Sequence, residues 1–164
     1  KYRKPSEIRI IHPYQLRQYN NRWFLIGYEP YMSDKLPVVT VPLDRIDFIE
    51  CAQDLIYQEY RGIDLDEYFN QVVGVSVNIG AKSEKIHIKA FYPAAAYIES
   101  KPLHGSQKII ENNNDSIIFE YNLILNYEFE TILLAYLDEC EIIKPIYLRQ
   151  KLHKRAVKIL ENTK

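Results

Sequence analysis

The sequence predicts an α+β fold in two parts, a small SH3- or Sm-like β-barrel followed by a ferredoxin-like unit. Residues 8–50 hold short runs of β-branched and aromatic residues divided by turn formers. Residues 76–164 instead alternate strand-like and amphipathic helical segments. The 25 residues between them carry one Lys or Arg against five Asp or Glu. We therefore expect a barrel over 1–51, an acidic connector over 52–75 and a ferredoxin-like unit over 76–164.

Four or five short strands are expected in the barrel, because turn chemistry interrupts the apolar runs at short intervals. The Asn20-Asn21 pair can adopt the positive φ that a tight hairpin needs. Alternation along the following strand places Trp23 and Leu25 on one face, and we expect both to be core residues together with Ile46. The expected strands are 8–11, 14–19, 22–28, 38–41 and 43–49.

The second part reads as βαββαβ with a terminal helix, which is the ferredoxin-like order. Apolar residues at helical spacing, such as Phe129, Leu133 and Leu137, indicate an amphipathic helix between two strands. Pro145 begins the last helix, and a short helix over 63–69 is expected in the connector. The remaining expected elements are strands at 85–90, 107–111, 116–123 and 140–143 and a helix at 93–100.

Composition excludes several classes of protein. The chain has 164 residues and a net charge of −1, so any contact with nucleic acid depends on a local patch. Cys51 and Cys140 are far apart, which fits a reducing cytoplasm and gives no zinc-site spacing. No apolar run approaches the ~20 residues that cross a bilayer, and no signal-peptide pattern occurs. We expect a cytoplasmic protein without a cofactor or membrane contact, present here as a fragment of a longer chain.

Motifs of catalysis are missing from the sequence, so an enzyme is not expected. There is no GxSxG, HExxH or phosphate-binding glycine loop. His12, His87, His104 and His153 do not pair at metal-ligand spacing. Ser106 follows His104 closely, but no third orienting group is identifiable for a triad.

Cationic and aromatic residues gather in the first part and form the candidate binding site. A base can stack on an aromatic ring while a cation meets its phosphate, so this combination suits single-stranded nucleic acid. Arg45 is expected to point away from Ile46 and Phe48, toward a ligand. The competing interpretation is that Asp44 or Asp47 holds Arg45 in an ion pair. The candidate binding residues are Arg45, Arg22, Arg17, His12, Tyr14 and Tyr28.

Several motifs resemble the WYL domain, a ligand-sensing module of bacterial transcriptional regulators. They are His12-Pro13-Tyr14, the strand Arg22–Tyr28 and Leu43-Asp44-Arg45-Ile46. The namesake triplet reads Trp23-Phe24-Leu25, so one phenolic hydroxyl of the family pattern is absent. The second part resembles the WCX extension that follows WYL domains, around Phe69 to Gly74, Ser106-Gln107 and Pro145 to Arg149.

The resemblance implies a homodimeric transcription factor whose barrel binds a nucleic-acid or nucleotide-like effector, with single-stranded DNA favoured. Duplex operator DNA would then be bound only by an N-terminal helix-turn-helix, which these residues do not contain. One alternative is a stand-alone module that holds single-stranded nucleic acid without regulation, as Sm-like domains do. Another is a small-molecule enzyme, which would need a clustered acid–base set. The cations of the terminal helix, from Arg149 to Lys158, are either a solvated face or a partner surface.

Overall fold

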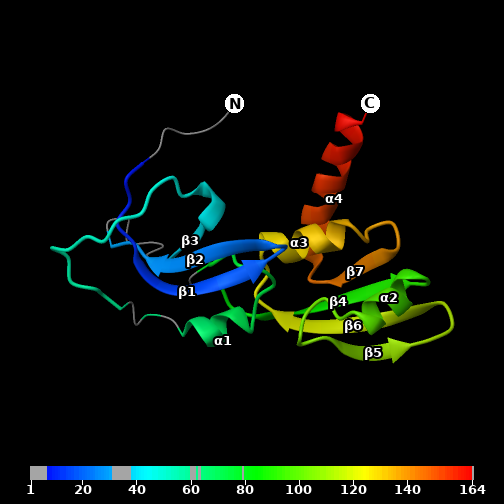
Figure 1. The fold of residues 1–164 in the computed structure, drawn as a ribbon. Coiled ribbons are helices and arrows are strands. Elements are labelled where there is room, and N and C mark those ends of the chain that lie inside the picture. Colours follow the sequence, from blue (N-terminus) through cyan, green and yellow to red (C-terminus); the bar gives the residue numbers. More distant parts are fainter. Residues whose placement is uncertain (1–6, 31–37, 60–61, 63, 79, 164) are drawn as a thin grey trace. The chain divides into compact units, whose positions relative to one another are not determined.

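The computed structural model describes residues 7–30, 38–59, 62, 64–78 and 80–163. The chain divides into two compact units. The first comprises Lys1–Leu65 and Val75–Gly80, and the second Asp66–Gly74 and Ala81–Lys164. Each unit contains its own antiparallel β-sheet, drawn in Figure 1.

The first unit contains a three-stranded sheet in the order β1-β2-β3, made of His12–Tyr19, Arg22–Tyr28 and Val38–Pro42. Within the described residues these strands do not close into the expected barrel. The strand expected at 43–49 is wrong, because the chain turns into a 3-10 helix, η1, at Leu43–Arg45. The turn is closed by the Ile46 amide, which donates to the Leu43 carbonyl at 3.2 Å. Residues 8–11, also expected as a strand, are outside regular structure.

The β1–β2 hairpin forms as the sequence predicts. Asn20 and Asn21 have φ angles of 48° and 59°, and Tyr19 pairs with Arg22 across the two-residue turn. A tight turn of this kind needs positive φ at both positions, which Asn tolerates better than most residues. This turn fixes which side chains of β1 and β2 face each other.

The buried face of this sheet is the opposite of the one we expected. Ile26 is fully buried, whereas Trp23 is 49% exposed, so the prediction that Trp23 is a core residue is wrong. Leu25 and Ile46 are only half-buried. Strand alternation separates two faces, but it does not say which one the rest of the chain covers. Thr40, which pairs with Ile26, donates its hydroxyl to the Val75 carbonyl at 2.9 Å, so the backbone of Val75 lies beside the Ile26 face.

The second unit has a four-stranded antiparallel sheet in the order β5-β6-β4-β7. Its elements follow the expected order βαββαβ plus a terminal helix, which is a split βαβ arrangement. The elements in this order are β4 (Glu84–Phe91), α2 (Ala94–Ser100), β5 (Lys108–Asn112), β6 (Ser116–Leu123), α3 (Tyr127–Leu134), β7 (Cys140–Lys144) and α4 (Ile146–Asn162). The short helix α1 (Leu65–Phe69) precedes them in the chain. Strand β4 buries alternate residues, as the sequence pattern predicts, whereas β5 is exposed along its whole length.

One face of this sheet makes the core of the second unit. Ile88 of β4 and Phe119 of β6 are paired and are almost completely buried. Helical residues are equally buried, among them Ile98 of α2 and Phe129 of α3. Apolar burial of this kind is the main stabilising contribution to such a unit. None of the described helices is long and apolar enough to cross a membrane.

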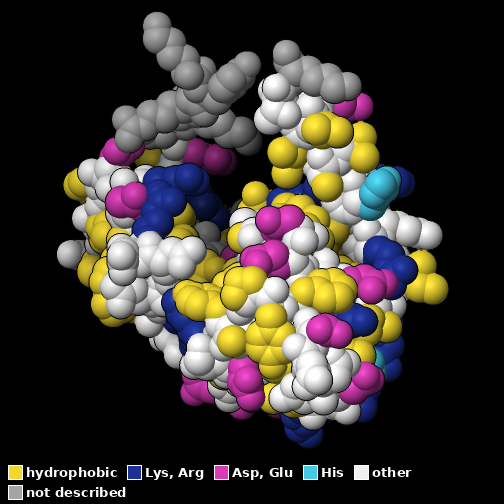
Figure 2. All heavy atoms as spheres, turned by 90° about the vertical axis from the view of Figure 1, so that its right-hand side faces the viewer, with side chains coloured by type: hydrophobic (Ala, Val, Ile, Leu, Met, Phe, Trp, Pro, Cys, Tyr) yellow, Lys and Arg dark blue, Asp and Glu magenta, His cyan; other side chains and the backbone are white. Residues whose placement is uncertain are grey.

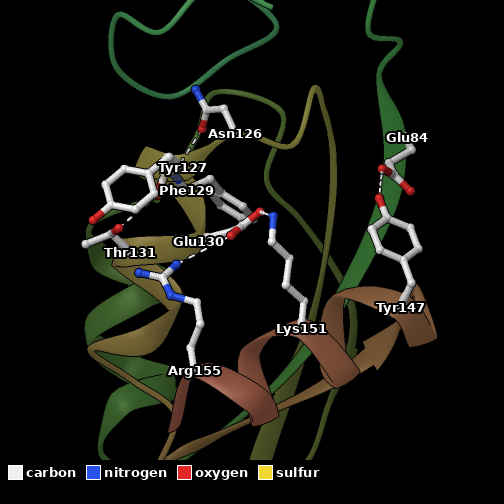
Figure 3. Close-up of polar contacts among 9 residues, drawn as sticks. All are labelled: Glu84, Asn126, Tyr127, Phe129, Glu130, Thr131, Tyr147, Lys151 and Arg155. Carbon is white, nitrogen blue, oxygen red and sulfur yellow. Dashed lines mark hydrogen bonds and ion pairs between the residues drawn. The ribbon is translucent and has the colours of Figure 1, made fainter. Parts of the chain in front are cut away.

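Helix α3 is fixed at both its start and its side. Asn126 caps it by accepting the Phe129 amide at 3.0 Å, and its amide group donates to the Val73 carbonyl at 2.6 Å. Glu130 is 5% exposed and receives Lys151 at 2.5 Å and Arg155 at 3.4 Å, both from α4 (Figure 3). These two cations therefore serve the α3–α4 contact, a role that neither interpretation of the α4 cations included.

Candidate functional site

An aromatic cluster lies at one end of the first sheet. The His12 and Tyr28 rings stack with centroids 5.7 Å apart, as expected for residues paired across β1 and β2. Tyr57 meets His12 edge-on at 5.9 Å and Tyr14 edge-on at 6.3 Å. We call His12, Tyr14 and Tyr28 the aromatic cluster, against which Tyr57 packs. Edge-on and stacked contacts are the favoured geometries of aromatic rings, so the group is pre-ordered for a further ring.

Hydrogen bonds tie residues 57 and 58 to β1. The Gln58 amide donates to His12 Nδ1 at 3.1 Å, and the Tyr14 hydroxyl donates to the Gln58 carbonyl at 3.3 Å. The Tyr57 hydroxyl donates to the Pro13 carbonyl at 3.3 Å. Because Nδ1 of His12 accepts, the proton of the neutral ring is on Nε2. His12 itself is only 7% exposed, so its polar edge is covered by the backbone of Gln58.

Close backbone packing holds His12 in place. Gly27 of β2 pairs with Pro13, and a Cβ at position 27 would lie 2.5 Å from Ile11 Cγ2 and 2.7 Å from the His12 carbonyl oxygen. Only glycine leaves room for this approach. The register also shifts between Pro13 and Gln15, which leaves Tyr14 out of the regular pairing. Such irregularities redirect a side chain, here one that reaches Gln58.

A cationic group lies at the other end of β2. The Arg22 guanidinium binds Asp44 through two nitrogens, with Nε 2.9 Å from Oδ1 and Nη2 2.7 Å from Oδ2. This guanidinium holds the pKa of the Asp44 carboxyl below its usual value. Arg45 is exposed, and its side chain makes no hydrogen bond or ion pair with any described residue. We call Arg22, Asp44 and Arg45 the cationic group.

The structure therefore separates the six predicted binding residues. His12, Tyr14 and Tyr28 come together, and Arg22 and Arg45 come together, but the two groups sit at opposite ends of β2. Six residue steps of a strand span roughly 20 Å. Arg17 belongs to neither group: it lies on the edge strand β1 and pairs with Phe24, and its guanidinium lies 3.5 Å from the Gln15 side chain.

Sequence reasoning missed Tyr57 and Gln58, because the acidic connector was treated only as a boundary. The apolar run Leu55-Ile56-Tyr57 inside an acidic stretch was the available signal. It also missed an ion pair between Arg9 and the buried Glu29, which directly follows Tyr28. Their separation of twenty positions gives no local pattern.

Charge on the molecular surface agrees with a local site. On the face drawn in Figure 2, basic and acidic side chains are interspersed. The sequence has 21 Lys or Arg against 22 Asp or Glu, so no general attraction to nucleic acid follows from net charge.

The His104–Ser106 pair of the second unit stabilises a turn. His104 Nδ1 lies 2.8 Å from Ser106 Oγ and accepts the Ser106 amide at 3.1 Å. Ser106 Oγ also accepts the Asn122 amide at 2.9 Å, so the hydroxyl is committed to the turn. Burial lowers the pKa of His104, and a hydrogen bond with the Asn70 backbone partly offsets this. In the part of the chain that the structure describes, no three His, Cys, Asp or Glu side chains could hold a metal.

Comparison with known proteins identifies the class of the second unit. Residues 82–160 match the family model of the WCX domain. The chain therefore contains a WCX domain, which confirms the resemblance found in its second part. The match covers the sheet of the second unit and most of α4.

Comparison with individual proteins adds less. No curated protein matches the chain. Among solved structures, proteasome accessory factor B/C (PafBC) of Arthrobacter aurescens is similar, with 13% sequence identity and a TM-score of 0.32. The similarity covers 88% of this chain and 21% of that chain, so this chain spans about a fifth of its length.

Proposed function

We propose that this chain is the effector-sensing part of a bacterial transcriptional regulator. Its ligand is a nucleic-acid or nucleotide-like anion, and single-stranded DNA is favoured. The WCX domain supports this class, since the motifs of the first part resemble the WYL domain that WCX follows. Effector binding would change the affinity of an N-terminal helix-turn-helix for duplex DNA. Such a change requires that the effector bind one conformation better than another.

The observation that carries the proposal is the spacing of the aromatic cluster and the cationic group along β2. Rings can stack with bases, and the exposed Arg45 can meet a phosphate with its planar fork. A ligand that touches both groups must extend over roughly 20 Å, the rise of about six stacked nucleotides at 3.4 Å each. This length favours an oligonucleotide over a mononucleotide.

Substitution of Arg45 by alanine tests the proposal. We expect Arg45→Ala to weaken binding of a fluorescent oligothymidylate about tenfold to a hundredfold, because a charge-assisted contact contributes ~1.5–3 kcal/mol. The measurement is an anisotropy titration at about 0.15 M salt, where the Debye length is ~8 Å. The melting temperature should not change, since Arg45 has no ion pair within the described residues.

Lys158→Ala is the matched control, because it removes one exposed positive charge from α4, outside both groups. It should leave the affinity within about twofold, since exposed charges are well screened. Equal weakening by Arg45→Ala and Lys158→Ala would show that only net charge matters. Unchanged affinity in Arg45→Ala would contradict the assigned role.

A stand-alone module for single-stranded nucleic acid is the second candidate. It is favoured by one observation: the aromatic cluster and the cationic group both belong to the first unit. Ligand binding therefore needs no residue of the WCX domain. The sequence encoded upstream of Lys1 distinguishes the candidates, since a helix-turn-helix there supports the regulator.

A further inference from the structure

Residues 55–58, which we call the strap, lie against the aromatic cluster. The strap has no regular secondary structure and belongs to the first unit. Its contacts with β1 join positions more than forty residues apart, through the Gln58 amide, the Gln58 carbonyl and the Tyr57 hydroxyl. These groups therefore meet because of the fold and not because they are close in the sequence.

The strap presents the same chemistry as a nucleotide base. Tyr57 supplies an aromatic ring against His12 and Tyr14. Beside this ring, Gln58 offers a donor to His12 Nδ1 and an acceptor to the Tyr14 hydroxyl. An unstacked base is recognised in the same way, by stacking on aromatic side chains and by hydrogen bonds to donors and acceptors on its edge. The strap thus occupies the place in which a base would make these contacts.

The strap is held weakly. Ile56 is 87% exposed and Tyr57 is 57% exposed, so the strap buries little apolar surface. The hydrogen bonds that involve the Tyr14 and Tyr57 hydroxyls are exposed and measure 3.3 Å. Water competes for such bonds, and segments with few buried contacts open at low cost. His12 beneath the strap is by contrast buried and fixed by its β2 neighbours.

We propose that the strap is an internal competitor of the effector: a base of single-stranded nucleic acid displaces Tyr57 and Gln58 from His12 and Tyr14. This inference rests on the function proposed above and adds regulation of the same site. The strap precedes Leu65, where the main segment of the first unit ends. Displacement of the strap breaks its contacts with β1, which supplies a conformational change for the effector to drive.

Tyr57→Ala tests the proposal in the full chain, with oligothymidylate as the probe. A strap closed about nine-tenths of the time reduces the apparent affinity about tenfold, so its loss should tighten binding by that factor. Tyr57→Phe, which keeps the ring and loses the bond to Pro13, should tighten binding less. Ile56→Ala is the matched control from the same segment and should leave the affinity unchanged.

Hydrogen exchange of the Gln58 amide gives a second readout on the unmodified chain. This amide donates to His12, so saturating oligothymidylate should accelerate its exchange while the amides of β2 stay protected. Tighter binding by Tyr57→Ala together with faster exchange at Gln58 supports the strap as a competitor. Binding by Tyr57→Ala alone, without binding by the wild type, supports it too.

Three results would overturn it. Weaker binding by Tyr57→Ala with slower exchange at Gln58 would make Tyr57 part of the binding surface and leave the proposed function standing. Affinity equal to that of Ile56→Ala would show that the strap does not compete. Absence of binding by the wild type and by every variant would contradict both the proposed function and the proposal that the strap competes with the effector.

Discussion

At the scale of single residues, two side chains of the same type can differ in their contacts because their surroundings differ. Arg22 and Arg45 flank the same Asp44, yet Arg22 takes both of its oxygens and Arg45 remains exposed. Asp44 therefore pairs directly with Arg22, while Arg45 acts on the same carboxylate only through its charge, which also helps to lower the pKa of Asp44. The binding role of Arg45 stays a prediction. Surroundings also distinguish two apolar residues of β2, since Ile26 is buried and Trp23 is exposed.

Alanine substitutions should show which face of the first sheet is the core. We expect Ile26→Ala to cost about 2–5 kcal/mol, because it empties a fully buried site. Trp23→Ala should cost about 1 kcal/mol, the usual effect of a single substitution, since half of the side chain is already in water. Denaturant midpoints of the two variants measure the difference. A larger loss for Trp23→Ala would restore the face that sequence alternation suggested.

At the scale of elements, the approach of β1 to β2 depends on a missing side chain. Gly27→Ala should destabilise the first unit by about 1–3 kcal/mol, because the new methyl group would overlap the His12 backbone and Ile11. It should also weaken oligothymidylate binding by shifting His12. Gly105→Ala is the control, since a Cβ there would meet no atom within 4 Å. Wild-type stability of Gly27→Ala would show that β1 can move without cost.

The turn between α2 and β5 should respond to pH through His104. Its folded pKa is below the usual value of 6.5, mainly because burial disfavours the charged ring. As the pH falls below about 6.5, the unfolded chain binds a proton that the folded chain resists, so stability decreases until the folded pKa is passed. Chemical denaturation between pH 7.5 and roughly pH 5 measures this slope. His104→Asn should make it shallower, and an unchanged slope would assign the effect to another group.

At the scale of the whole molecule, the proposed function separates two kinds of nucleic acid. The chain should bind oligothymidylate and no duplex operator, because the duplex-binding part would lie upstream. With about two phosphate contacts, a fourfold rise in salt should weaken single-strand binding about sevenfold. Anisotropy titrations at two salt concentrations test both points. Tight, sequence-specific binding to duplex DNA would contradict the sensor.

Homodimerisation belongs to this scale too and stays a proposal. Part of α4 offers a surface for it, since Ile159 and Leu160 are more than half exposed while Leu148 and Leu152 on the same helix are buried. Such a helix end is compatible with a partner, but the described residues do not identify one.

The sequence by itself determined the elements whose signal is local. The Asn20-Asn21 turn, strand β2 and the order of elements in the second unit follow from turn chemistry and periodicity, which neighbouring residues set. The WCX domain followed from motifs in that same region. These features need no knowledge of what packs on them.

Only the tertiary structure decided which surfaces are covered and which distant residues meet. Alternation could not tell that the Ile26 face is buried and the Trp23 face exposed, because that depends on residues far along the chain. The turn at Leu43–Arg45 replaced an expected strand, since a strand needs a partner as well as a suitable sequence. The contact of Tyr57 and Gln58 with His12 spans more than forty positions, so no local pattern encodes it.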